Sequence, residues 1–198
     1  MKNYKLFVCI ISLLFCASCF QTSNVRFVTP QPESLNPLEI IPEKFQGTFV
    51  IKKDTIVVTD YTVDGGTINS DSLIVKGWGN YLFVNKLDVP KGSDKALYLL
   101  ACAKVVNVWN NEEISLHQFY IDFESQLDDF VLKTDTAGLS EDELILLFSQ
   151  YITSNPPNDN YVGLTEDGDY ILDNVSLNEF QTMLNKSAES STEVTRIN

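Results

Sequence analysis

The chain of 198 residues has little of the chemistry that metal centres and hydrolytic active sites use. It contains one histidine, His117, and four cysteines. Structural zinc sites need clusters of His and Cys, and a Ser–His–Asp relay needs a histidine directed at its serine. The chain also has no glycine-rich phosphate loop, no Gly-x-Ser-x-Gly elbow and no dinucleotide fingerprint. We therefore expect no metal, no cofactor and a non-enzymatic protein.

Basic residues are also scarce, with 14 Lys and Arg against 27 Asp and Glu and a net charge of −13. Nucleic-acid binding depends on basic contacts to phosphate, so this class of partner is excluded. An acidic chain is also repelled by anionic lipid, so any membrane contact should come from an anchor. The charge otherwise indicates a soluble surface.

Long hydrophobic runs are absent except at the N-terminus, where Lys2 and Lys5 precede the apolar residues 6–15. A positive start, a short apolar core and the small pair Ala17-Ser18 form a secretory signal pattern. The run is shorter than the roughly 20 residues that span a bilayer. We expect residues 1–18 to be a cleaved signal peptide.

Cys19 directly follows the small residues, and Cys16-Ala17-Ser18-Cys19 resembles the lipobox of bacterial lipoproteins. Cys16 stands where an aliphatic residue is usual. The resemblance implies lipidation (palmitate) of Cys19 and a membrane partner through the anchor. No acidic cluster follows Cys19, which favours the periplasmic face of the outer membrane over the cell surface.

Cys102 is then the remaining free thiol, and it lies in the apolar segment 97–103. Export would permit a disulfide, but a single cysteine forms none within the chain. Apolar surroundings raise a thiol pKa, so we expect a buried, inert side chain.

The rest of the chain divides by composition. Residues 19–42 contain four prolines among Gln, Thr, Ser and Asn, which predicts an extended tether behind the lipidated cysteine. Residues 43–186 form one expected domain, and residues 187–198 are polar and are expected to be a disordered tail.

The expected fold class is α+β, with an antiparallel β meander of about six strands followed by a helix–hairpin–helix segment. Runs rich in Val, Ile, Thr, Tyr and Phe between residues 45 and 123 are separated by Gly, Asn and Asp turns, which is typical of half-buried strands. The motif Ser140–Glu143 is a capping box that predicts a helix ending before Pro156. A hairpin follows at 161–172, and Ser176 begins a second helix. Residues 124–135 fit helix or strand.

Segments 42–49 (PEKFQGTF), 54–58 (DTIVV), 170–172 (YIL) and 176–180 (SLNEF), together with the lipobox, resemble small uncharacterised lipoproteins of Bacteroidetes. The resemblance implies a lipid-anchored β-rich domain and carries no activity. The triplet Gly47-Thr48-Phe49 is similar to the Gly-x-Trp that begins lipocalin barrels, with Phe in place of Trp.

Three groups of residues carry side chains that could act in catalysis or bind a metal ion. His117 shares a strand face with Ser115, and we expect it to face solvent or the edge of the core, with Ser115 pointing alongside it. Glu124, Asp128 and Asp129 would share a face if their segment is helical, which leaves a carboxylate-dependent hydrolase as an alternative.

The acidic turns at 158–160 and 166–169 offer oxygen ligands, but neither has the spacing of an EF-hand, so turn chemistry is the preferred explanation.

Trp78 and Trp109 lie in expected turns, where each either folds back on the core or binds a partner. The leading hypothesis is a non-enzymatic binding or interaction module anchored in the cell envelope, with an envelope protein as partner. A lipocalin-like carrier of a small apolar ligand is the other alternative to the hydrolase. An empty apolar barrel favours the carrier, two acids about 5 to 10 Å apart in a cleft favour the hydrolase, and a filled core with exposed aromatics favours the interaction module.

Overall fold

The computed structural model describes residues 22–51, 54–108, 111–122, 124–134, 138–156, 159–187 and 192–197. Within these ranges the chain forms thirteen strands, three α-helices and one 3₁₀ helix. The strands are β1 (Thr22–Phe27), β2 (Gly47–Ile51), β3 (Asp54–Val58), β4 (Thr62–Val63), β5 (Gly66–Thr67), β6 (Leu73–Trp78), β7 (Tyr81–Asp88), β8 (Leu97–Val108), β9 (Asn111–Gln118), β10 (Tyr120–Asp122), β11 (Tyr161–Leu164), β12 (Tyr170–Leu172) and β13 (Thr192–Ile197). The helices are η1 (Glu43–Phe45), α2 (Glu124–Lys133), α3 (Glu141–Ser154) and α4 (Leu177–Ser187).

Strand β8 is the axis of the sheet. One edge of β8 pairs antiparallel with β7, which in turn pairs with β6. Along the other edge of β8, the first residues of β8 pair with β1 and the later residues of β8 pair with β9. Strands β1 and β9 therefore lie one after the other along this edge. Strand β1 then pairs with β10 and, in parallel, with β12.

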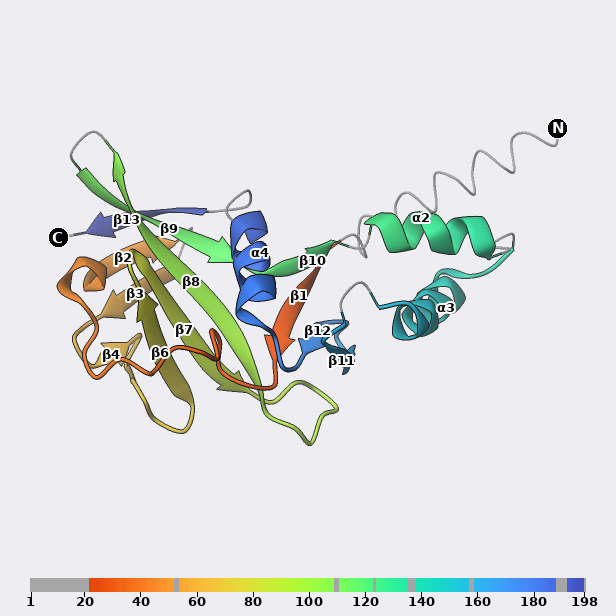
Figure 1. Ribbon diagram of the computed structural model, residues 1–198, viewed down its shortest axis with the longest axis horizontal. Helices are drawn as coiled ribbons and strands as arrows, with labels where there is room; N and C mark the ends of the chain where they lie inside the picture. Colours follow the sequence, from red (N-terminus) through yellow and green to blue (C-terminus); the bar gives the residue numbers. More distant parts are fainter. Residues whose placement is uncertain are drawn as a thin grey trace.

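The sheet curls because β13 joins two of its parts. The first half of β13 pairs with β9, and its second half pairs with β2. Strands β3, β4 and β5 continue the order beyond β2. The curled sheet occupies the left of Figure 1, with β13 running across its top.

The segment that leads into β2 covers the remaining edge of the curl. Pro37 bridges to Lys76 on β6, and the Leu38 amide donates to the Val75 carbonyl at 2.8 Å. A few residues later the Ile41 amide donates to the Asp60 carbonyl at 2.9 Å. The chain therefore links the edge of β6 to the loop after β3.

Two hydrophobic cores lie on opposite faces of the same strands. Val84, on the inner face of the curl, packs against the cluster that includes Phe49, Val58 and Val105. Its neighbour Phe83, on the outer face, packs beneath α4. Alternate side chains of a strand point to opposite faces, so one run of apolar residues supplies both cores.

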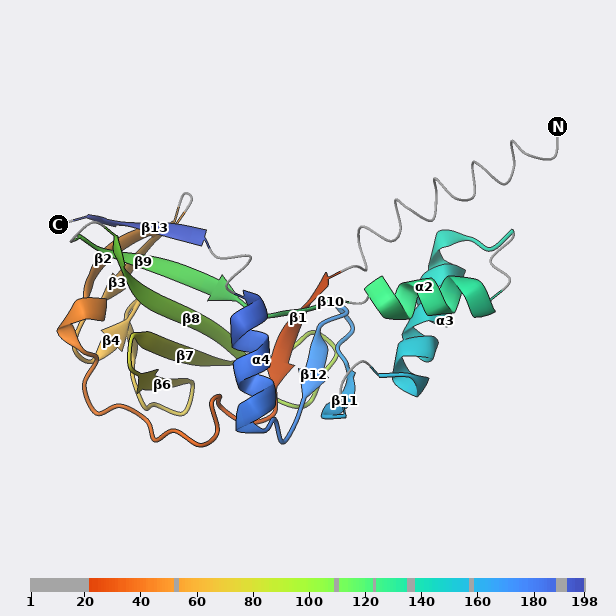
Figure 2. The same ribbon diagram turned by 45° about the horizontal axis from the view of Figure 1, so that its top comes forward.

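Helix α4 stands between the curled sheet and the end of the molecule formed by β1, β11 and β12 (Figures 1 and 2). Beyond that end lie α2 and α3, far from β2, β3 and β13 (Figures 1 and 2). In the part of the chain that the structure describes, no helix combines the length and apolar character needed to cross a membrane.

The predicted fold class is wrong. The molecule is mostly β-sheet, and the hairpin β11–β12 does not stand apart with its helices, because β12 joins the sheet beside β1. The local features are correct: Ser140 and Glu143 form the predicted capping box, α3 ends before Pro156, and β11 pairs antiparallel with β12. Segment 124–133, whose sequence fits helix or strand, is the helix α2.

The ends of the described chain also differ from expectation. Within the expected tether, Thr22–Phe27 forms a strand whose Phe27 is fully buried. Within the expected tail, Ser187 is buried at the end of α4 and Thr192–Ile197 forms β13. Both strands pair with residues distant in sequence, which local periodicity does not report. The expected signal peptide and Cys19 lie outside the described residues.

Candidate binding cavity

A cavity of about 480 Å³ lies inside the curled sheet. Phe45, Val63, Gly66 and Leu100 belong to its apolar lining, and thirteen further aliphatic and aromatic side chains lie on seven strands, most of them at two-residue spacing. These are Phe49 and Ile51 on β2, Ile56 and Val58 on β3, Leu73 on β6, Leu82 and Val84 on β7, Leu99, Ala101 and Ala103 on β8, Ile114 and Leu116 on β9, and Val194 on β13. The spacing identifies the cavity as the interior of the curl.

Small residues on the central strand leave this space. Ala101 and Ala103 face inward on β8, where larger residues would fill the interior. Gly66 lines the opposite part, and a Cβ added there would lie 3.2 Å from Cδ2 of Leu73. The longest strand, β8, therefore carries small side chains on the face that lines the cavity.

One end of the cavity is closed by aromatic packing. Phe45 and Phe49 are buried there, and the Arg196 guanidinium lies over the Phe49 ring at 5.8 Å from the ring centre. Gly47 has a φ of 137°, and a Cβ at this position would come within 2.9 Å of Nε of Arg196. Glycine at the start of β2 therefore lets the guanidinium approach and donate to the Gln46 carbonyl.

The other end carries the polar lining. Asp64, Ser72 and Lys86 border the cavity there, and all three are exposed. Ala101 is exposed as well although it lines the apolar wall, so the cavity opens to solvent at this end. We call these residues the mouth.

The outer face of the same strands is filled instead. Asn85 exchanges two hydrogen bonds with the backbone of Gln31, both at 2.7 Å. The Lys76 ammonium donates to the carbonyls of Pro30 and Pro32, each at 2.8 Å. Burial lowers the pKa of Lys76. These contacts hold the proline-containing segment against the sheet.

His117 lies on this outer face and is buried, so it does not face solvent as one expectation had it. Its Nε2 is 3.2 Å from Ser115 Oγ, and its Nδ1 is 3.3 Å from Ser187 Oγ. Ser115 is therefore bonded to the ring, contrary to the prediction that it points alongside. The Ser187 hydroxyl donates to the Leu184 carbonyl, which makes Nδ1 the donor to Ser187 and Nε2 the acceptor from Ser115.

Burial, followed by the nearby positive charge of Lys104, lowers the pKa of His117. Two serine hydroxyls hydrogen-bond to the ring and, among the described residues, no carboxylate does, so these residues form no Ser–His–acid relay. Cys102, across from His117 in the ladder, is fully buried, and burial raises its pKa to about 12. The prediction that Cys102 is a buried, free thiol is confirmed.

The acidic residues considered for hydrolysis lie on α2, away from the cavity (Figure 1). Of these, Asp129 accepts hydrogen bonds from Lys133 at 2.5 Å and from Tyr151. The hydrogen bonds from Lys133 and Tyr151 lower its pKa. In the described ranges no three His, Cys, Asp or Glu side chains gather closely enough to hold a metal ion.

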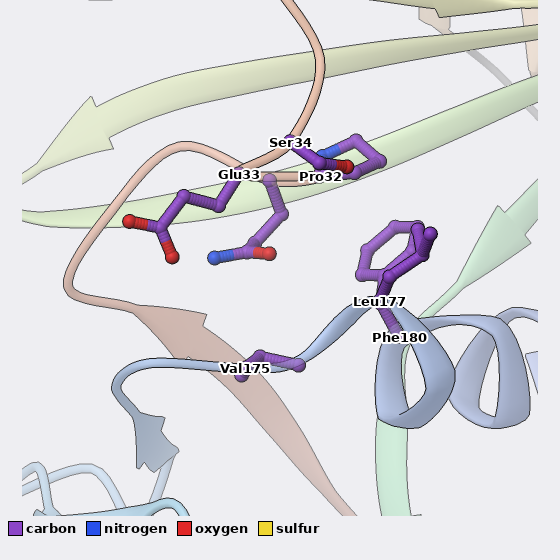
Figure 3. A pocket seen from close by; sticks show the side chains of 7 residues that line it. Pro32, Glu33, Ser34, Val175, Leu177 and Phe180 are labelled. Atoms are coloured by element: carbon purple, nitrogen blue, oxygen red, sulfur yellow. The ribbon is translucent and has the colours of Figure 1, made fainter.

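A second, smaller pocket of about 270 Å³ lies between the segment after β1 and the start of α4. Figure 3 shows Glu33 on one side of it and Val175 and Phe180 on the other. Gln31 also lines this pocket. Its Oε1 is buried and accepts no hydrogen bond from the described residues. Glu33 and Ser34 supply exposed polar groups to this pocket, and Val175, Leu177 and Phe180 form its apolar side.

Of the residues predicted for partner binding, Trp78 is half exposed at the end of β6. Its ring stacks on Tyr81 with centroids 6.3 Å apart, and it does not line the cavity. Trp109 lies outside the described residues. Sequence reasoning missed the cavity residues, although the alternation of Ala101, Ala103 and Val105 within an apolar strand is a signal for one narrow-walled face.

Comparison with protein-family models, with curated proteins and with solved structures finds no match for this chain.

Proposed function

We propose that this protein is a non-enzymatic carrier that binds a small apolar or amphipathic ligand inside the curled sheet. The observation that carries the proposal is the apolar cavity of about 480 Å³. Ligand sites are concave, mostly apolar and of roughly 300 to 1,000 Å³, with a few polar groups that orient the ligand. Protein interiors otherwise pack densely and hold few voids larger than a water molecule.

The geometry favours the carrier over the two other hypotheses. The interaction module requires a filled core, whereas the inner face of β7 to β9 borders open space. The hydrolase requires two acids that share a cleft, and Asp64 is the one carboxylate on the wall of the described cavity. The carrier requires an apolar interior with room for a ligand, and the size and apolar lining of this cavity support it.

We also propose that Cys19 is lipidated and holds the protein in the cell envelope, at the periplasmic face of the outer membrane. Two residues separate Cys19 from Thr22, the first residue of β1. A chain extends by at most about 3.6 Å per residue, so a lipidated Cys19 would keep this end of the domain within roughly 15 Å of the bilayer. Thr22 pairs with Asp122, two residues before α2, so α2 would lie on the membrane side.

The cavity proposal is tested by filling the space. A fluorescent apolar probe such as N-phenyl-1-naphthylamine should bind the wild type with enhanced emission. Ala103→Leu places an isobutyl group in the cavity and should weaken probe binding about tenfold or more. The control is Thr55→Leu, because Thr55 is exposed and alternates with the cavity residue Ile56, so its side chain points outward.

Equal probe binding by wild type, Ala103→Leu and Thr55→Leu, with all three folded by circular dichroism, would contradict a ligand site in the curl. The anchor is tested separately by metabolic labelling with palmitate. Label should appear on the wild type and be absent from Cys19→Ala, and label that survives the substitution would refute lipidation at Cys19.

A further inference from the structure

The apolar cavity has a lysine at its mouth, Lys86, which forms no ion pair with the described residues. Lys86 is the last inward-facing residue of β7 that lines the cavity, two positions beyond Val84. It is exposed, and its Cα partner in the ladder is Leu99, another cavity residue. Its ammonium group is therefore placed where apolar wall meets solvent.

From this placement we infer that the ligand is a single-chain amphiphile with a carboxylate head, whose aliphatic chain fills the cavity and whose head pairs with Lys86. The inference rests on the proposed carrier function and names the class of its ligand. The apolar walls select the chain, and the charge at the mouth selects the head.

Three other lysines on or beside the curled sheet already have side-chain contacts. Lys76 donates to two backbone carbonyls, Lys44 donates to the Gly79 carbonyl and to Asn80, and Lys104 lies over the Tyr81 ring at 5.2 Å. Lys86 forms no ion pair with any carboxylate of the described residues. The nearest acidic residue on its own strand, Asp88, is paired with Arg26 at 2.7 Å.

The length of the wall fits an extended chain. From Leu82 at the buried end to Lys86 at the mouth, β7 spans four residues, which is roughly 13 Å at about 3.3 Å per residue. Leu82 is almost fully buried and Lys86 is exposed, so polarity rises along one direction. An amphiphile enters such a site with its chain first.

Asp64 is the opposing charge at the same mouth. Asp64 lies in the turn that leads into β5, two residues before Gly66. Gly66 lies close to Leu73, and Leu73 pairs with Lys86, so Asp64 and Lys86 border the same part of the cavity. A carboxylate ligand is repelled by Asp64, so Asp64 should limit the affinity that Lys86 provides. A fatty amine would instead be attracted by Asp64 and repelled by Lys86. The two residues should therefore have opposite effects on the binding of carboxylate and amine ligands.

The test measures displacement of the fluorescent probe by dodecanoate, dodecanol and dodecylamine, at pH 7.5, below micelle-forming concentrations. Exposed ion pairs contribute up to about 1 kcal/mol, or roughly fivefold in affinity. Lys86→Met should therefore weaken dodecanoate binding by about fivefold and leave dodecanol binding unchanged. Lys86→Arg should keep dodecanoate binding near the wild-type value, and Asp64→Asn should tighten it.

The head-group assignment is overturned if Lys86→Met changes dodecanoate and dodecanol equally, if it changes neither, or if dodecylamine is the preferred ligand. Those results would not contradict the proposed ligand site in the cavity, as long as Ala103→Leu still weakens binding of the probe. Failure of all three amphiphiles and of the probe to bind the wild type would instead refute the carrier function. The exposure of Lys86 and Asp64 makes both positions suitable for substitution without loss of the fold.

Discussion

The two faces of strands β7 to β9 are made by the same sequence runs, and yet one face is filled and the other is hollow. On the outer face, Phe83 and Phe119 both contact Phe180 of α4, with ring centroids 5.5 Å apart in each case. On the inner face, Val84 and Ala103 border the cavity. Both faces are apolar, so hydrophobicity alone does not distinguish the core from the binding site.

Side-chain size and the covering element account for the difference. The outer face carries aromatic rings, and a helix with its own Phe180 and Leu184 completes the packing. The inner face carries aliphatic side chains, among them the small Ala101 and Ala103, and its cover is the far side of the same sheet. Among the described residues no α-helix packs against the inner face, because this face lies opposite other strands of the same sheet. Small side chains on the inner face therefore leave a space.

The largest expected effect comes from removing β13, which should destroy the hollow side and spare the filled one. Deletion of residues 192–198 separates β9 from β2 and removes Val194 from the wall. Probe binding should fall by more than tenfold. Near-ultraviolet circular dichroism from the aromatic core under α4 should persist.

Deletion of Asn198 alone is the control for trimming the terminus and should leave probe binding unchanged. Full probe binding by the longer deletion would show that the curl closes without β13.

Matched leucine truncations compare the two faces directly. Leu184→Ala empties a position in the filled core, where Leu184 is 4 % exposed, and should cost about 3 kcal/mol of unfolding free energy. Leu116→Ala enlarges an existing cavity with a half-buried side chain and should cost about 1 kcal/mol. Urea denaturation of both variants measures the difference. Equal losses would mean that the inner face is as tightly packed as the outer one.

A smaller effect should follow pH, because the outer face buries a titratable ring. The pKa of His117 is lowered in the folded protein by burial and by Lys104, so the folded state binds fewer protons than the unfolded state near the unfolded pKa of 6.5. The stability that this group contributes is complete above pH 6.5 and is lost as the pH falls toward the folded value.

Unfolding free energy should therefore decrease between pH 7 and pH 5.5, and His117→Gln should flatten that decrease. The carboxylate of Asp88 titrates lower, because the hydrogen bond from Arg26 lowers its pKa, and so it does not obscure this window. An unchanged slope in His117→Gln would assign the pH dependence to other groups.

The smallest effect is expected at Trp78, which belongs to neither the cavity nor the helix-covered core. Trp78→Ala should cost about 1 kcal/mol, the size of one aromatic stack on Tyr81. Its effect on probe binding should be negligible. A loss of binding to an envelope protein in pull-downs from native membranes would support the partner role that the sequence proposes for this residue.

Much of the local structure could be predicted from the sequence. The capping residues Ser140 and Ser176 begin helices because their side chains and those of the glutamates three positions later satisfy free backbone groups. The turn after Trp78 forms with Gly79 in the left-handed region, at a φ of 58°. The cavity could not be predicted, because alternation identifies two faces and does not say which of them a helix will cover.

By itself the sequence determined the helix starts, several strands and turns, and the apolar character of the segment around Cys102, since each depends on residues that lie close together in the chain. Only the tertiary structure decided that Thr22–Phe27 and Thr192–Ile197 are strands, because their hydrogen-bond partners lie far away in the chain. It also decided that Lys86 borders an apolar cavity. The physical reason is that a strand gains its hydrogen bonds from other segments, and the closure of the curl fixes which side chains enclose space.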